Sequence, residues 1–180
     1  MERQPAPSTA PISYDDWCVW VDALEAGSCD AELIRLASLS RTTWTAAVAK
    51  LFARRAHDAL NARLNRVGSS LQRRLSDCRD EASISLALVH ARRSLHALGE
   101  FADLDVFPDA LREALGDLVR HHVRARQEAL EKSARADRTG RLALALRRSP
   151  LDQRGPVQPF AARAPAAAPT GRRIILDHGS

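Results

Sequence analysis

Histidine and cysteine are the side chains in this sequence best suited to bind a metal or to act as a nucleophile. There are six histidines and three cysteines. The cysteines, at positions 18, 29 and 78, form no Cys-x-x-Cys pair and have no zinc-ligand spacing with any histidine. His57 and His122 lie on or near the apolar seams of predicted helices, but no Glu-x-x-His pair accompanies them. We interpret both as packed, hydrogen-bonded core residues, and the sequence predicts no metal site.

Motifs for catalysis and cofactor binding are also missing from the sequence. It contains no nucleophile elbow, no phosphate-binding loop and no signature of paired catalytic carboxylates. The sequence places no base near Cys78, so an activated thiol is not expected. We therefore predict no catalytic residues and no cofactor, in a protein that is not an enzyme. The odd, sparse cysteine count is typical of a reducing compartment, which predicts a cytoplasmic location.

Arginine gives the chain its most distinctive chemical property. The formal net charge is +5, and only Lys50 and Lys132 among the 27 basic residues are lysines. The charge is unevenly distributed, with a net of −4 over residues 1–47 and +7 over residues 48–148. An acidic head on a basic body suits a nucleic-acid partner or an acidic protein surface. The alternative is a basic face that only contacts solvent.

The longest predicted helix, residues 41–75, carries its arginines on the side opposite its apolar seam. At 100° per residue these arginines share one face. We name them as nucleic-acid-binding candidates: Arg55, Arg63, Arg66, Arg73 and Arg74. Guanidinium groups are well shaped to bind phosphates along a backbone. Beyond Trp44 in its first turn, the helix has Phe52 as its one Phe, Tyr or Trp side chain, so duplex or structured RNA fits better than a single strand, and an acidic protein fits equally well.

Residues 30–48 have some features of a DNA-binding helix-turn-helix. Ser40 would cap the second helix, and its first turn would present side chains to the groove of DNA. These further candidates are Arg41, Thr42, Thr43 and Thr45. Ile34 and Ser38 depart from the small residue and the turn glycine that such a unit usually has. The alternative is a plain capped helix start.

The spacing of proline and leucine sets the predicted fold. Between Pro11 and Pro150 the only proline is Pro108, and the apolar residues recur at steps of three and four. We predict helices near 13–26, 30–37, 41–75, 80–101, 108–138 and 141–148. The fold class is therefore all-α, a helical bundle of three long amphipathic helices plus one or two short N-terminal ones, with a disordered C-terminal tail. Residues 1–12 are a flexible leader, 13–148 the α-helical bundle domain, and 149–180 a Pro/Ala-rich tail.

Two further segments are candidates for binding a protein partner. Trp17 and Trp20 fall one helical turn apart near the N-terminus. The tail ends in a basic and apolar peptide: Arg172, Arg173, Ile174, Ile175 and Leu176. Such a peptide on an extended tether suits docking into a groove of a partner, whereas the alternative is a frayed C-terminus.

These observations lead to a ranked set of functions. The first is a non-enzymatic assembly, adaptor or structural accessory protein that binds other macromolecules through the arginine-rich face and the tail peptide. Its partner is a protein or a second copy of the chain, and no membrane is expected because no apolar run is long enough. The second is a helix-turn-helix-like DNA-binding regulator. The third is a structured-RNA or genome-packaging protein.

Overall fold

The described part of the chain is entirely helical. The structure, a computed structural model, describes residues 9–26 and 31–152, with the side chains of residues 31–33 excepted. This part contains six α-helices and no β-strand, which confirms the predicted all-α bundle. The helices are α1 (Tyr14–Ala26), α2 (Ala31–Ser38), α3 (Ala46–Asp77), α4 (Glu81–Ala102), α5 (Asp109–Ala136) and α6 (Arg141–Arg148).

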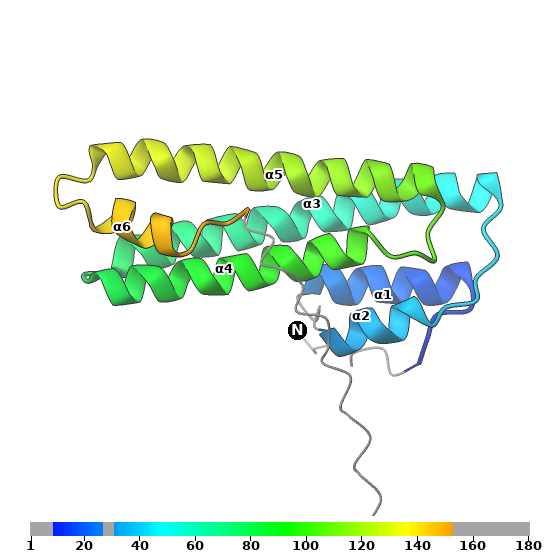
Figure 1. The fold of residues 1–180 in the computed structure, drawn as a ribbon. Helices are drawn as coiled ribbons and strands as arrows, with labels where there is room; N and C mark the ends of the chain where they lie inside the picture. The colour runs from blue at the N-terminus through cyan, green and yellow to red at the C-terminus, as the bar shows by residue number, and fades with distance from the viewer. Residues whose placement is uncertain (1–8, 27–30, 153–180) are drawn as a thin grey trace, which may run out of the picture.

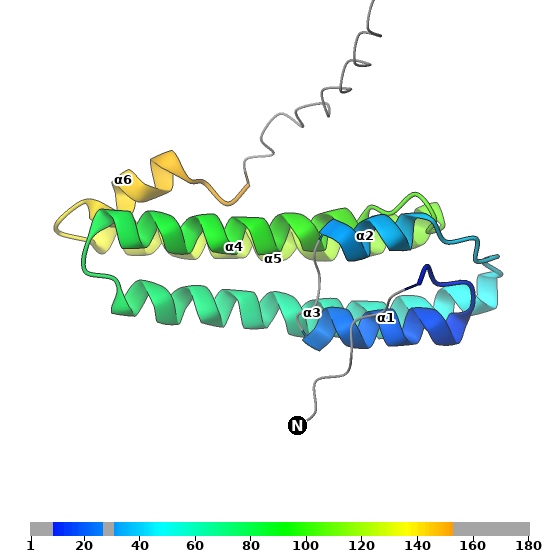
Figure 2. The same ribbon diagram turned by 90° about the horizontal axis from the view of Figure 1, so that it is seen from below.

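The three long helices α3, α4 and α5 form the body of the bundle, and each runs opposite to the one before it (Figure 1). Helices α1 and α2 lie at one end, with α1 against α3 and α2 against α4. Helix α6 packs on α4 and α5 at the other end. The view in Figure 2 shows α1 and α2 alongside only part of the α3–α4 pair.

Side-chain caps fix where the helices begin. Ser13 and Asp16 form a capping box before α1, in which the Asp16 carboxylate accepts from the Ser13 backbone N–H at 3.0 Å and the Ser13 hydroxyl accepts from the Asp16 N–H at 3.2 Å. Asp80 caps α4 by accepting from the Ser83 N–H at 2.8 Å. Thr45 caps α3 by accepting from the Val48 N–H at 3.3 Å.

The start of α3 differs from the prediction. Residues 40–45 are not helical, and Thr45 rather than Ser40 is the N-cap. The reason is that the Ser40 hydroxyl donates to the Pro11 carbonyl oxygen at 2.7 Å and also accepts from the Thr42 N–H at 3.2 Å. Hydrogen bonds of this kind, between a side chain and the backbone, compete with the hydrogen bonds of a helix and keep residues 40–45 non-helical. From Ala46 onward the helix is continuous, through Gly68, to Asp77.

The spacing of the apolar residues predicts one buried seam on each long helix: Ala53, Leu60, Leu64, Val67, Leu71 and Leu75 on α3, Ile84, Leu88, Ala91, Leu95 and Leu98 on α4, and Leu111, Leu115, Leu118, His122, Ala125 and Ala129 on α5. The seams of α3 and α4 are largely correct, but that of α5 fails toward its C-terminal end. On α5, Val119 and Leu130 are buried, whereas the predicted Ala125 and Ala129 are exposed. Leu118 and Val119 are adjacent apolar residues, so the pattern is compatible with two lines along the helix. The observed line continues through two polar residues, the half-buried His122 and Arg126.

Aromatic side chains form the core at the end where α1 packs. Trp17 is fully buried and lies 5.0 Å from Phe107, centroid to centroid, and 5.6 Å from Phe52. Trp44 lies 5.1 Å from Phe52. These rings come from α1, α3 and the two loops before α3 and α5, so they join segments that are distant in the sequence.

The packed part of the chain is slightly longer than predicted at both ends. Pro11, placed in the flexible leader by the sequence, is fully buried, and its carbonyl oxygen is the acceptor for Ser40. At the other end, Ser149 and Leu151 are buried beyond the predicted boundary at residue 148.

Candidate anion-binding groove

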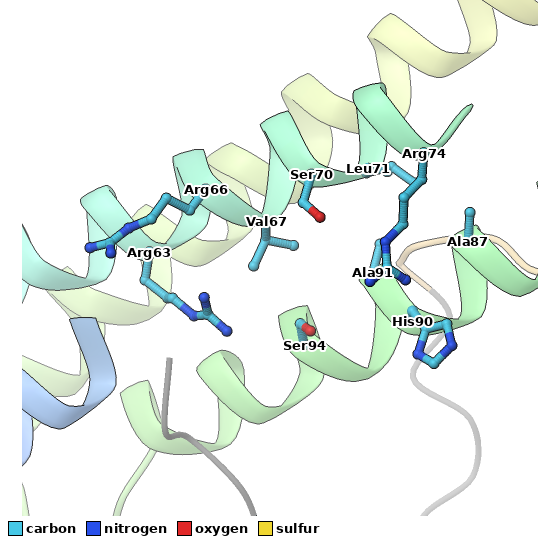
Figure 3. A pocket seen from close by; sticks show the side chains of 10 residues that line it. All are labelled: Arg63, Arg66, Val67, Ser70, Leu71, Arg74, Ala87, His90, Ala91 and Ser94. Carbon is cyan, nitrogen blue, oxygen red and sulfur yellow. The ribbon is translucent and has the colours of Figure 1, made fainter. Parts of the chain in front are cut away.

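A groove between α3 and α4 is lined by basic and hydroxyl side chains of both helices (Figure 3). Its volume is about 210 Å³. The lining residues are Arg63, Arg66, Val67, Ser70, Leu71 and Arg74 from α3, and Ala87, His90, Ala91 and Ser94 from α4. Within each helix these positions are three or four residues apart, which places them on one face.

The three arginines of the lining occupy the two ends of the groove. Figure 3 shows Arg63 and Arg66 at one end, Arg74 and His90 at the other, and the two serines, Ser70 and Ser94, between them. None of the described lining residues is acidic. A groove with several fixed positive groups and no negative one attracts anions, and guanidinium groups donate readily to carboxylate and phosphate oxygens.

The floor of the groove offers little apolar surface. Val67 and Ala91 are only 8% and 6% exposed, and Leu71 is 2% exposed. A ligand would therefore gain little from hydrophobic contact and much from hydrogen bonds and charge. The volume of about 210 Å³ leaves room for a carboxylate or phosphate group together with water.

Arg66 lies where helix α1 meets the groove. Its guanidinium donates to the Glu25 carboxylate at 2.9 Å, and both side chains are about half exposed. An ion pair this exposed is weak and is screened by salt, so Arg66 can exchange Glu25 for another anion. Arg74, at the far end, makes no ion pair with any residue of 9–26 or 31–152.

The structure brings together three of the five arginines predicted from the face of the long helix. Arg63, Arg66 and Arg74 line the groove, whereas Arg73 is exposed outside its lining. Arg55 lies closer to the start of α3 and donates to the Asp22 carboxylate of α1 at 2.6 Å. This hydrogen bond and the charge of Asp22 raise the pKa of Arg55.

The residues predicted to read DNA do not form the first turn of a helix. Arg41, Thr43 and Thr45 are exposed in the non-helical segment before α3. Thr42 is half-buried, and its hydroxyl oxygen accepts from the Trp17 indole N–H at 2.9 Å. The predicted presentation of these side chains on a recognition helix is therefore corrected, because the helix that follows begins only at Ala46.

The structure describes one of the two groups of residues predicted to bind a protein partner. Trp17 and Trp20 are 0% and 5% exposed and belong to the hydrophobic core, so their rings are not on the surface as the prediction required. The tail peptide, residues 172–176, lies outside the described residues.

The α4 side of the groove was not predicted from the sequence. Of the lining residues of α4, Ala91 belongs to the predicted seam, whereas Ala87, His90 and Ser94 flank it, and His90 by itself carries no recognisable pattern. The spacing of three and four residues between these positions does show that they share one face of α4. The sequence alone does not show which face of α3 packs against that face, so the two halves of the groove could not be brought together.

The two histidines considered as a potential metal pair have different surroundings. His122 is half-buried, and its Nε2 lies 2.8 Å from the Asn61 side-chain oxygen on α3. Burial, together with the neighbouring His121, Arg126 and His57, lowers the pKa of His122. His57 is exposed instead of packed, with its Nδ1 3.6 Å from an Asp58 oxygen. Across the described ranges, no three of the His, Cys, Asp and Glu side chains are grouped so that they could hold a metal ion.

The class of protein that emerges is an all-α helical bundle with a basic groove between two of its long helices. None of the six described helices has the length and apolar character needed to cross a bilayer. Comparison with protein-family models, curated proteins and solved structures finds no match to this chain.

Proposed function

We propose that the protein is a non-enzymatic adaptor or assembly subunit that binds an acidic protein partner through the α3–α4 groove. The observation that carries this proposal is the lining of the groove, which has three arginines, a histidine and two serines but no acidic side chain. Groups of this kind bind carboxylates by charge-assisted hydrogen bonds, without any chemistry on the ligand.

Three observations favour an acidic protein over nucleic acid. No Phe, Tyr or Trp side chain lines the groove, so the bases of a single strand would find little stacking surface there. Residues 41–45 form no first turn of a recognition helix, which weighs against the helix-turn-helix alternative. The groove is also short, which suits a few anionic side chains better than a long phosphate backbone.

The proposal is tested by comparing defined anionic probes on the full 180-residue chain. Binding of a glutamate-rich peptide, duplex DNA and an RNA hairpin is measured at about 50 and 200 mM salt, because electrostatic binding weakens over this range. The wild type is compared with Arg74→Glu, and with Arg124→Glu as a control. Arg124 is exposed on α5, so its substitution changes the net charge equally but lies outside the groove.

We expect the acidic peptide to bind, to weaken with salt, and to lose about tenfold in affinity in Arg74→Glu relative to Arg124→Glu, the equivalent of about 1.4 kcal/mol. Equal effects of the two substitutions would show that the groove is not the binding site. If the RNA hairpin binds tightly and the peptide does not bind, the proposed adaptor function would be wrong, and RNA binding would be the better proposal.

A further inference from the structure

We infer that the groove receives an acidic helix of the partner, which lies along α3 in continuation of α1 and presents two carboxylates about two helical turns apart. This inference rests on the proposed function and specifies the segment that binds. It follows from three features: the packing of α1 on α3, the separation of the two cationic ends, and the narrow floor between them.

Helix α1 shows how an acidic helix packs on α3 in this protein. Its buried face, with Val21 and Leu24, lies toward the bundle, and two acidic side chains beside that face reach arginines of α3. Asp22 pairs with Arg55 at 2.6 Å, and Glu25 pairs with Arg66 at 2.9 Å. Helix α1 ends at Ala26, one residue after Glu25, and the groove residues begin in the same region of α3.

The separation of the cationic ends sets the spacing of the ligand. Arg66 and Arg74 are eight residues apart on α3, which at 1.5 Å per residue is about 12 Å along the helix. On a ligand helix, residues i and i+7 share one face and are about 10.5 Å apart. The two carboxylates of such a pair would reach Arg66 at one end and Arg74 with His90 at the other.

The middle of the groove restricts the side chains between the two carboxylates. Ser70 and Ser94 lie between the cationic ends, and both hydroxyls can donate or accept. The residues at i+3 and i+4 of the ligand helix would therefore be small or polar. Because the floor is almost fully buried, the complex depends on charge and is strongly salt-sensitive.

The test uses three alanine-based peptides with the same number of glutamates and the same net charge. In the first, two glutamates are at i and i+7; in the second they are at i and i+2, on different faces; the third repeats the first with a central proline that breaks the helix. Each is titrated into the isotope-labelled full chain at about 50 mM salt, and the shifts of the backbone amide signals of Ser70 and Ser94 report the site. An RNA hairpin is titrated in parallel.

We expect the first peptide to bind about tenfold more tightly than the other two, with shifts at Ser70 and Ser94 that Arg74→Glu abolishes and Arg124→Glu preserves. Equal binding of all three peptides at the groove would overturn the helix and its spacing but would support the acidic partner. Binding of the RNA hairpin alone, or of no probe, would overturn both the inference and the proposed function.

Discussion

The backbone of Gly68 in α3 lies directly under the guanidinium group of Arg126 in α5. A Cβ atom at residue 68 would overlap the end of the Arg126 side chain. This contact explains a glycine in the middle of a continuous helix, where glycine is normally unfavourable. The absence of a side chain at this position leaves room for the Arg126 guanidinium group against α3.

Substitution of two helical glycines by alanine should therefore have unequal effects. Gly99 in α4 has open space where a Cβ atom would lie, so Gly99→Ala should stabilise the fold by up to about 1 kcal/mol through helix propensity. Gly68→Ala gains the same propensity but must displace Arg126, so its net gain should be smaller. Urea unfolding of both variants measures the difference, and a larger gain for Gly68→Ala would contradict the role given to this contact.

Removal of the Glu25 carboxylate should strengthen binding at the groove. Glu25→Gln frees Arg66 for an anionic ligand, so we expect the affinity for an acidic peptide to rise about two- to threefold, close to the value of an exposed ion pair. Asp22→Asn is the matched control, because it removes the pair with Arg55, which is outside the groove. A peptide titration of both variants checks this, and an equal rise in affinity would point to a general charge effect.

The Trp17–Thr42 hydrogen bond should contribute measurably to stability. Thr42→Val keeps the shape of the side chain but leaves the buried indole N–H of Trp17 without its acceptor, which should cost about 1–3 kcal/mol. Thr43→Val, one position further, changes an exposed residue and should be nearly neutral. Thermal unfolding measures the loss of stability in Thr42→Val and Thr43→Val. A similar loss in both variants would mean that the Trp17–Thr42 hydrogen bond adds little to stability.

Stability should fall as the pH is lowered below about 6.5, the ordinary pKa of histidine. The pKa of His122 is lowered in the folded state, so the unfolded chain binds a proton more readily at this position than the folded chain does. The free energy of unfolding must then decrease with falling pH until the folded-state pKa is passed. Urea unfolding at pH 7.5 and 5 should show this loss in the wild type and less of it in His122→Gln. The exposed His96→Gln serves as a control that should retain the wild-type behaviour.

The long helices could be predicted from the sequence because their apolar residues recur over many turns. All five predicted seam residues of α4, including Leu88 and Leu98, are buried, and α6 has the predicted bounds. The start of α3 was misplaced because Ser40 and Thr45 are both suitable N-caps, and the choice depends on the distant carbonyl of Pro11. Local patterns cannot supply that long-range contact.

The candidate site was predictable only in part, for a similar physical reason. A single helix shows which of its residues share a face, so Arg63, Arg66 and Arg74 were identified together. It does not show which neighbour that face approaches, so His90 and Ser94 across the groove were missed. Trp17 and Trp20 had the periodicity of a helix face, but the pattern does not distinguish a face covered by the bundle from one offered to a partner.

The aromatic cluster has a consequence for the order in which the chain acquires its structure during synthesis. Trp17 packs against Phe107, which is ninety residues further along the chain, so the ribosome must add Phe107 before α1 has its full set of contacts. By contrast, α3 and α4 are joined by the short segment 78–80 and pair as soon as both have emerged. Helix α1 is therefore synthesised before the segments that it packs against and completes its packing late, and until then its two tryptophans are accessible to other molecules that contact the nascent chain.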